Sequence, residues 1–218
     1  MFWRNNSLSI VLAALFVLSM AGQAGAGWLD YNSDATLHGD SAVPFLRYLQ
    51  SGHLWEATGE NWESEFLQMA AFVVLTCFLR QKGSAESKRI DVVEDVDLDP
   101  RRFADDPNSP WAVRRGGWVL KIYENSLGMA FVLMFLISIA MHASGGLSEF
   151  NSELASHGRP PVVAIQYLTS SRFWFESFQN WQSEFLSLFA MVVGTIFLRQ
   201  RGSAESKPLH ASNSETGR

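Results

Sequence analysis

The sequence has little cysteine, little surplus of either charge and no unbroken apolar run of twenty residues. Its single cysteine, Cys77, excludes an intrachain disulfide and leaves the redox compartment unassigned. Lysine and arginine number 17 against 22 aspartate and glutamate residues, and they form no basic face that would suit a nucleic acid. Phosphate-binding glycine loops, nucleophile elbows and HExxH motifs are absent, so we expect neither an enzyme nor a cofactor or metal centre.

Apolar residues make up 47% of the chain and concentrate in four runs. Three of these runs are only 14 residues long, whereas a membrane-spanning helix needs about 20. Each of the three extends through neighbouring residues, and no run shows a polar face at helical spacing. We therefore expect four membrane-spanning helices, at about residues 7–27, 61–80, 125–145 and 180–199. Buried core helices are the alternative for the short runs.

The chain contains a duplication at an offset of 119 residues. Residues 61–88 read NWESEFLQMAAFVVLTCFLRQKGSAESK and residues 180–207 read NWQSEFLSLFAMVVGTIFLRQRGSAESK, a match at 20 of 28 positions. The match extends without a gap over residues 6–88, with 37 identities in 83 positions. Self-similarity of this length indicates two structural repeats.

We therefore expect an all-α integral membrane protein with two tandem helix-loop-helix repeats of parallel topology. Residues 1–88 form repeat 1 and residues 118–207 form repeat 2. An acidic cytoplasmic linker (89–117) separates them, and a disordered tail (208–218) follows. Two spans per repeat insert both copies in the same direction, so their pseudo-two-fold axis would run along the membrane normal.

The distribution of lysine and arginine predicts the orientation. The predicted inner segments hold 14 of the 17 residues, and the outer loops hold Arg47, Arg159 and Arg172. The positive-inside rule then places both termini and the linker in the cytoplasm. The N-terminus also resembles a cleavable secretory signal. Its counterpart in repeat 2 is internal, which favours an uncleaved first span.

Aromatic residues mark the membrane interface in both repeats. Apolar and polar residues mix in amphipathic segments after Pro44 in the first outer loop and from Val162 in the second. We expect interfacial helices there, and the alternative is a loop packed over the bundle. Four tryptophans at matching positions are expected to act as interfacial anchors: Trp55, Trp62, Trp174 and Trp181.

The SEFL motif, present in both repeats, places Glu65 and Glu184 about one turn inside their predicted spans. Carboxylates within spanning segments are costly and usually face a bundle interior or a wet cavity. Such a pair would bind a cation or relay a proton. The alternative is structural, because a glutamate in the first turn of a helix is favoured by the helix dipole. Polar neighbours would line the same site or cap the helices: Asn61, Ser64, Asn180 and Ser183.

Histidine-glycine pairs recur in the outer loops, at His38-Gly39 and His157-Gly158. Two symmetry-related histidines would bind a metal, but neither loop offers a second ligand at metal-site spacing. A turn in which glycine takes a positive φ is the simpler interpretation. Gln23 and His142 occupy matching positions late in the first and third spans, where they would add ligands or simply be hydrogen-bonded.

The basic tails Arg80–Lys88 and Arg199–Lys207 are candidates for docking a cytoplasmic protein or anionic lipid headgroups. A helix stop with a topology signal explains their arginine, lysine and glycine residues. It does not explain why the segment Ser-Ala-Glu-Ser-Lys is identical in both tails.

Through the duplicated segments at residues 61–88 and 180–207, the chain resembles a family of small bacterial membrane proteins described only as a domain of unknown function. The resemblance covers nearly the whole chain, including SSRFWFESFQNWQSEFL and the end of the linker, PWAVRRGG. It implies a location in the bacterial inner membrane. It implies no activity, substrate or catalytic residue.

The sequence therefore favours a multi-pass protein of the inner cell membrane with a structural, interaction or envelope-associated role. The alternative is a small cation or proton channel or transporter centred on Glu65 and Glu184. Two repeats make a narrow bundle, so a homo-oligomer would be needed to enclose a path. The expected partners are the lipid bilayer, further copies of the chain and a cytoplasmic protein, and nucleic acid is not among them.

Overall fold

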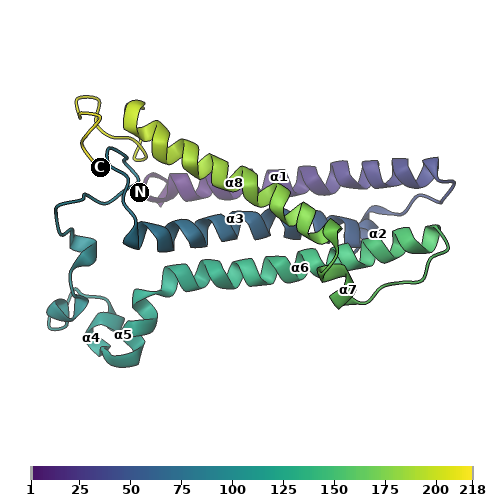
Figure 1. Ribbon diagram of the computed structural model, residues 1–218, viewed down its shortest axis with the longest axis horizontal. Helices are drawn as coiled ribbons and strands as arrows, with labels where there is room; N and C mark the ends of the chain where they lie inside the picture. Colours follow the sequence, from purple (N-terminus) through teal and green to yellow (C-terminus); the bar gives the residue numbers. More distant parts are fainter. Residues whose placement is uncertain (1, 218) are drawn as a thin grey trace. The chain divides into compact units, whose positions relative to one another are not determined.

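The computed structural model describes residues 2–217, and every regular element among them is a helix (Figure 1). The expectation of an all-helical chain is confirmed. Met1 and Arg218, the outermost residues of the predicted repeat 1 and tail, lie outside the described range. Four long helices dominate: α1 (Phe2–Leu37), α3 (Gly52–Phe78), α6 (Ser126–Ser156) and α8 (Ser171–Phe197). The shorter elements are α2 (Phe45–Tyr48), η1 (Asp95–Asp97), η2 (Pro100–Phe103), α4 (Trp111–Arg115), α5 (Gly117–Glu124) and α7 (Ala164–Leu168).

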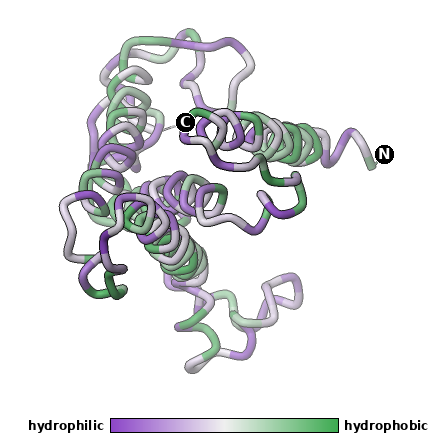
Figure 2. Tube along the Cα trace, turned by 90° about the vertical axis from the view of Figure 1, so that its right-hand side faces the viewer, coloured by the Kyte–Doolittle hydropathy of each residue, from purple (hydrophilic) through white to green (hydrophobic). Residues whose placement is uncertain are grey.

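Two of the long helices, α1 and α6, are long and apolar enough to cross a membrane. Most of the side chains in their apolar stretches are exposed rather than packed inside the protein. Helices α3 and α8 are not among these candidates, because the polar residues of their first halves dilute the apolar run that follows. Figure 2 shows apolar residues, in green, along the turns of the long helices. Two helices of the structure, α1 and α6, thus support an association of the chain with a membrane.

The long helices extend beyond the predicted spans. The expectation that Asn61 and Asn180 cap helices is wrong, because both lie inside helices that start at Gly52 and Ser171. Serine caps these helices instead. The Ser51 hydroxyl accepts a hydrogen bond from the Leu54 N–H at 3.3 Å. Ser170 does the same for Phe173, also at 3.3 Å. A serine side chain at this position satisfies an N–H group that the helix leaves unpaired.

The predicted interfacial helices are present only as single turns, α2 and α7. The aromatic residues that suggested longer helices, including Trp55 and Trp174, belong to α3 and α8. With Ser51 and Ser170 as caps, the long helices begin before these tryptophans and leave only four or five residues for α2 and α7.

The chain divides into two compact units. The first unit comprises Met1–Gly59 and Met141–Thr169, and the second comprises Glu60–Ala140 and Ser170–Arg218. Helices α3 and α6 each contribute one end to the first unit and the other end to the second.

In the first unit, α3 and α6 touch backbone to backbone. A Cβ atom added at Gly59 would lie 2.3 Å from the backbone nitrogen of His142. A Cβ atom added at Gly145 would lie 2.4 Å from the backbone nitrogen of Glu56. Only glycine fits at such distances, and close approach through small residues is typical of helix pairs in membranes.

Two buried tyrosines pack onto glycines at matching positions of the first unit. Tyr48 covers Gly27 of α1, and Tyr167 covers Gly146 of α6. A Cβ atom at either glycine would lie about 2 Å from the tyrosine hydroxyl, at 2.2 Å and 2.1 Å respectively. The short helices α2 and α7 are thereby held against the long ones.

Each outer loop is also clamped by an asparagine. The Asn32 side chain accepts a hydrogen bond from the Val43 N–H at 2.7 Å and donates one to its carbonyl at 3.1 Å. The Asn151 side chain makes the same pair of bonds to Val162, at 2.8 and 3.1 Å. An amide side chain can pair with a backbone amide in this way because it offers both a donor and an acceptor.

Replacing Asn32 or Asn151 by alanine should loosen the corresponding loop. Loss of a paired donor and acceptor costs about 1 kcal/mol at a partly exposed site, which corresponds to roughly fivefold faster hydrogen exchange of the loop amides. Hydrogen exchange followed by mass spectrometry measures this. Asn6→Ala is the control, because the Asn6 side chain donates to the Phe2 carbonyl in the exposed first turn of α1. Unchanged exchange at Val43 and Val162 would show that the clamps carry no energy.

The acidic linker contains regular turns in the structure. Asp99 caps η2 by accepting a hydrogen bond from the Arg101 N–H. Arg101 also pairs with the Asp99 carboxylate at 2.8 Å. Further along, the buried side chains of Ala112, Val113 and Leu120 belong to α4 and α5.

Candidate functional site

A line of polar contacts joins α3 to α8 in the second unit. The Trp181 indole N–H donates to the Glu63 carboxylate at 2.9 Å, and the Gln68 amide donates to the Ser187 hydroxyl at 2.9 Å. The Gln68 amide also donates to the Glu184 carbonyl at 3.0 Å. A fourth bond runs from Asn180 to the Glu60 carboxylate. We call these residues the α3–α8 seam: Glu60, Glu63 and Gln68 of α3, and Asn180, Trp181, Glu184 and Ser187 of α8.

The seam shows that α3 and α8 run in the same direction. Its side-chain pairs are separated by 120, 118 and 119 residues from the start of the seam to its end. A nearly constant separation requires parallel helices, since it would change steadily along an antiparallel pair. The separations also lie close to the repeat offset of 119, and Gln68 and Ser187 are equivalent positions of the two copies.

Within the seam, Glu63 is the carboxylate that the structure buries, and sequence reasoning missed it. Its side chain is wholly buried, whereas Glu65 is exposed. Glu184 is half-buried, and only its backbone carbonyl makes a described seam contact. The spacing of Glu60, Glu63 and Gln68 would have indicated a polar helix face that reaches into the apolar run. This face begins before the apolar run of residues 66–79 and enters it at Gln68.

The alternative role for Glu65, in the first turn of a helix, is also wrong. Helix α3 begins at Gly52, thirteen residues earlier, so the helix N-terminus is too far away to stabilise the Glu65 charge. The serines of the predicted site bond locally. The Ser64 hydroxyl donates to the Asn61 carbonyl, and the Ser183 hydroxyl donates to the Asn180 carbonyl, each at 2.8 Å.

The predicted aromatic anchors take different positions. The Trp181 ring packs edge-on against Phe135 of α6, with centroids 6.4 Å apart, while its N–H serves the seam. Trp174 lies 6.2 Å from Trp181, edge to face. Trp55 donates its indole N–H to the Leu49 carbonyl at 3.1 Å. Trp62 packs against Phe66 one turn along α3.

The first unit holds a second group of polar residues. The Tyr167 hydroxyl donates to the buried Glu56 carboxylate at 3.4 Å. The Tyr48 hydroxyl lies 3.1 Å from the His53 ring nitrogen. Burial, together with the nearby Asp30 and Glu149 carboxylates, raises the pKa of Tyr48. A hollow of about 300 Å³ beside this group is lined by Asp30, Tyr31, Ser33, Asp34, Leu37, His53 and Glu149.

The histidines singled out in the sequence serve helix ends and helix packing. The ring nitrogens of His38 and His157 lie 2.9 Å from the Asp34 and Glu153 carbonyls, at the ends of α1 and α6. His142 is buried where α6 touches α3, and Gln23 donates to the Thr58 hydroxyl at 3.2 Å. Among residues 2–217, no group of three or more histidine, cysteine, aspartate and glutamate side chains is arranged to hold a metal ion.

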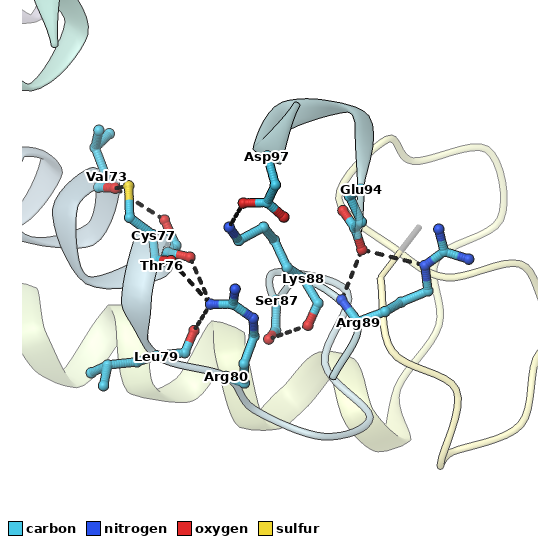
Figure 3. Close-up of polar contacts among 10 residues, drawn as sticks. All are labelled: Val73, Thr76, Cys77, Leu79, Arg80, Ser87, Lys88, Arg89, Glu94 and Asp97. Carbon is cyan, nitrogen blue, oxygen red and sulfur yellow. Dashed lines mark hydrogen bonds and ion pairs between the residues drawn. The ribbon is translucent and has the colours of Figure 1, made fainter. Parts of the chain in front are cut away.

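The basic tails close their helices in the same way in both copies. A single nitrogen of the Arg80 guanidinium points back to the last carbonyls of α3, as Figure 3 shows, at 3.1 to 3.4 Å from those of Thr76, Cys77 and Leu79. Arg199 makes the matching contacts at the end of α8, at 2.9 to 3.1 Å. An arginine at this position satisfies carbonyls that the helix end leaves unpaired.

The repeated Ser-Ala-Glu-Ser-Lys segment folds as the same turn twice. The first serine, Ser84 or Ser203, accepts a hydrogen bond from the N–H two residues on, in both cases at 3.1 Å. The second serine, Ser87 or Ser206, accepts one from the N–H six residues earlier, in both cases at 2.9 Å. These bonds explain why both serines are identical in the two copies, because each hydroxyl closes a backbone loop.

The lysines that end the two turns bind different groups. Lys88 pairs with Asp97 of the linker. Lys207 is buried and donates to carbonyls of Ser212, Asn213 and Glu215 at 3.1, 3.4 and 2.8 Å, and also to the Gly83 carbonyl. The pKa of Lys207 is lowered from its usual value, mainly by burial and also by the nearby Arg199 guanidinium. The Glu215 carboxylate opposes this shift without reversing it. The tail after Lys207, expected to be disordered, thus folds back onto its own lysine.

Acid should release the linker contact. The hydrogen bond from Lys88 lowers the pKa of Asp97 below its usual value (Figure 3). Because the folded-state pKa is depressed, the contact stabilises the linker above the usual aspartate pKa and loses its effect as the pH falls through the lowered pKa. Hydrogen exchange of residues 88–97 at decreasing pH would show the release. Asp97→Asn should remove this pH dependence, and an unchanged pH profile in that variant would contradict the assignment.

The chain was compared with protein families, with curated proteins and with solved structures. One family model, "Domain of unknown function (DUF6766)", matches it over residues 1–218. The chain belongs to this family. Neither the curated proteins nor the solved structures provide a match. The description of the DUF6766 family names no activity, so the geometry of the seam and the tails carries the functional argument.

Proposed function

We propose that the chain is a four-span integral membrane protein in which α1, α3, α6 and α8 all cross the bilayer. Exposed apolar side chains on all four helices support this. Water would disfavour such a surface, whereas lipid accommodates it. The residues include Leu12 and Leu18 of α1, Val74 and Leu75 of α3, Leu133 and Ile137 of α6, and Leu186 and Phe189 of α8.

The proposed architecture is two tandem helix-loop-helix repeats of parallel topology. Three recurring features support it: the asparagine clamps, the arginine caps and the serine turns all reappear 119 residues later. The parallel α3–α8 seam agrees with two copies inserted in the same direction. The distribution of lysine and arginine places both termini and the linker in the cytoplasm, and the proposed location is a bacterial inner membrane.

Labelling with a membrane-impermeant maleimide tests this topology. In a Cys77→Ser background, Ser109→Cys in the linker should stay unlabelled in intact cells and Ser156→Cys at the end of α6 should react. If only α1 and α6 crossed the membrane, these two results would be exchanged. Labelling of both sites after lysis is the control for thiol access.

The proposed role is structural: the chain is a membrane scaffold that presents its cytoplasmic tails to a partner. The seam carries this proposal, because each of its four hydrogen bonds joins one repeat to the other. Polar side chains that pair across helices hold spans together where apolar packing gives no preference over lipid. We also propose that copies of the chain associate in the membrane.

The tails offer a direct test of the partner. Lys82 and Arg201 are exposed and occupy matching positions, whereas Arg80 and Arg199 are engaged in helix caps. The double variant Lys82→Ala, Arg201→Ala should lose a protein that crosslinks to the wild type in cells, while the fold stays intact. Arg47→Ala plus Arg159→Ala, in the outer loops, is the control. A partner retained by the tail variant would count against docking at the tails.

A cation or proton path is the second candidate. The wholly buried Glu63 carboxylate favours it, because ionisable side chains buried in spans often mark such pathways. Proton flux into proteoliposomes should fall to background in Glu63→Gln and stay unchanged in Glu65→Gln, whose carboxylate is exposed. Background flux in the wild type would leave the seam with its structural role alone.

A further inference from the structure

The short helices α4 and α5 share a pattern that neither the spans nor the tails explain. In α4, Trp111 is followed by Arg114 and Arg115, and in α5, Trp118 is followed by Lys121 and Ile122. Residues three and four apart lie on one face of a helix. Each helix therefore presents a tryptophan beside a cation.

These faces point outward. Trp111 is 65% exposed and Trp118 is 73% exposed, and the cations Arg114, Arg115 and Lys121 are exposed as well. The opposite faces hold the buried residues Ala112, Val113 and Leu120. Two tryptophans are thus left outside while smaller apolar residues are buried. Tryptophan is one of the side chains with the most apolar area to bury, so two such rings at the surface leave a large contact area available.

A two-glycine corner sets the geometry of the two helices. Gly116 and Gly117 have φ values of +66° and +60°, a region that residues with a Cβ atom adopt only with strain. The corner ends α4 and starts α5 within one residue, so both tryptophan-cation faces are fixed by the backbone rather than by a flexible linker.

The position in the chain indicates what covers this surface. Helix α5 ends at Glu124, and α6, a candidate membrane span, begins at Ser126. The surface therefore lies at the end of a span, where tryptophan favours the boundary between headgroups and acyl chains. The three cations outnumber the single acid of residues 111–124, Glu124, which favours an anionic partner.

We propose that Trp111, Arg114, Arg115, Trp118 and Lys121 bind anionic phospholipid headgroups of the inner leaflet. The tryptophan rings lie among the upper acyl chains, and the guanidinium and ammonium groups contact the lipid phosphates. The acids of the preceding linker segment, Asp105 and Asp106, face the same membrane side and limit the attraction to the α4–α5 surface itself. This inference rests on the proposed membrane topology.

The test uses the full chain reconstituted in vesicles of phosphatidylcholine, with and without phosphatidylglycerol. Brominated phosphatidylglycerol should quench tryptophan fluorescence more than brominated phosphatidylcholine does, and raised salt should reduce this preference. Each cation near an anionic surface contributes about fivefold, so the triple variant Arg114→Gln, Arg115→Gln, Lys121→Gln should lower the preference up to about 100-fold. Trp111→Phe plus Trp118→Phe should remove the difference in quenching between the two brominated lipids, while the six remaining tryptophans are still quenched.

The matched control is Arg89→Gln, Arg101→Gln, Arg102→Gln, which removes three exposed cations of the linker on the same membrane side. The proposal is overturned if both triple variants lose the preference equally, or if neither loses it. Equal quenching of the wild type by both lipids also overturns it, whatever the variants do. A chain that does not float with the vesicles would instead contradict the proposed membrane location, so the two failures are distinguishable.

Discussion

Gly59→Leu should unfold the protein at a markedly lower denaturant concentration than the wild type. The added side chain meets backbone on α6, since even a Cβ atom would lie 2.3 Å from the His142 nitrogen and 2.9 Å from its Cα. Backbone cannot rotate away as a side chain does, so the helices must separate. We expect a loss near the upper end of overpacking effects, about 3 kcal/mol, measured by loss of helical circular dichroism in detergent.

Gly22→Ala is the matched control for this variant. Gly22 also lies inside a long helix, but an added Cβ would meet nothing within 4 Å. Alanine has the higher helix propensity, so no loss of stability is expected. If Gly59→Leu behaved like Gly22→Ala, the close contact of α3 with α6 would not exist in solution.

Lys207→Met should release the C-terminal tail. The methionine keeps the length of the side chain but leaves carbonyls of Gly83, Ser212, Asn213 and Glu215 facing an apolar group. Hydrogen bonds from a charged donor contribute about 1.5–3 kcal/mol, so loss of the set should expose residues 208–217 to proteases roughly 100-fold faster. Limited proteolysis with detection of the C-terminal fragment measures this.

Lys88→Met separates this effect from a general effect of lost charge. Lys88 holds the same place in the first repeat, but its partner Asp97 belongs to the exposed linker. An ion pair with an exposed carboxylate contributes little to stability, so this variant should change tail proteolysis little. Equal sensitivity of the two variants would mean that the carbonyl cage around Lys207 does not hold the tail.

The long helices follow from the apolar runs, but their starts do not. Asparagine beside tryptophan at positions 61 and 180 resembles the first residue of a span at an interface, and this suggested caps there. The caps are Ser51 and Ser170, which are identical in the two copies and precede the aromatic segments. The two serines were therefore a visible signal for the helix starts. The segments between them and the asparagines, residues 52–60 and 171–179, contain charged residues and suggested loops rather than helix.

The choice of carboxylate shows a second limit. Glu65 and Glu184 drew attention because they are identical in both repeats, whereas the counterpart of Glu63 is Gln182. Helical spacing places Glu63 and Gln68 on one face, so a polar face was predictable. The helix that this face contacts was not predictable, because Trp181 and Ser187 lie more than a hundred residues further along the chain.

The α3–α8 seam also imposes an order in time. Glu63 is synthesised 118 residues before Trp181, the residue whose indole it binds. In the proposed four-span topology, synthesis at 5–20 residues per second leaves roughly 6–24 s in which the carboxylate has entered the apolar environment and Trp181 does not yet exist. During that interval α3, the less apolar helix, depends on the strongly apolar α1 that precedes it to stay inserted. When the ribosome is stalled after α6 and before α8 is made, helix α3 of the nascent chain should therefore still be able to leave the bilayer.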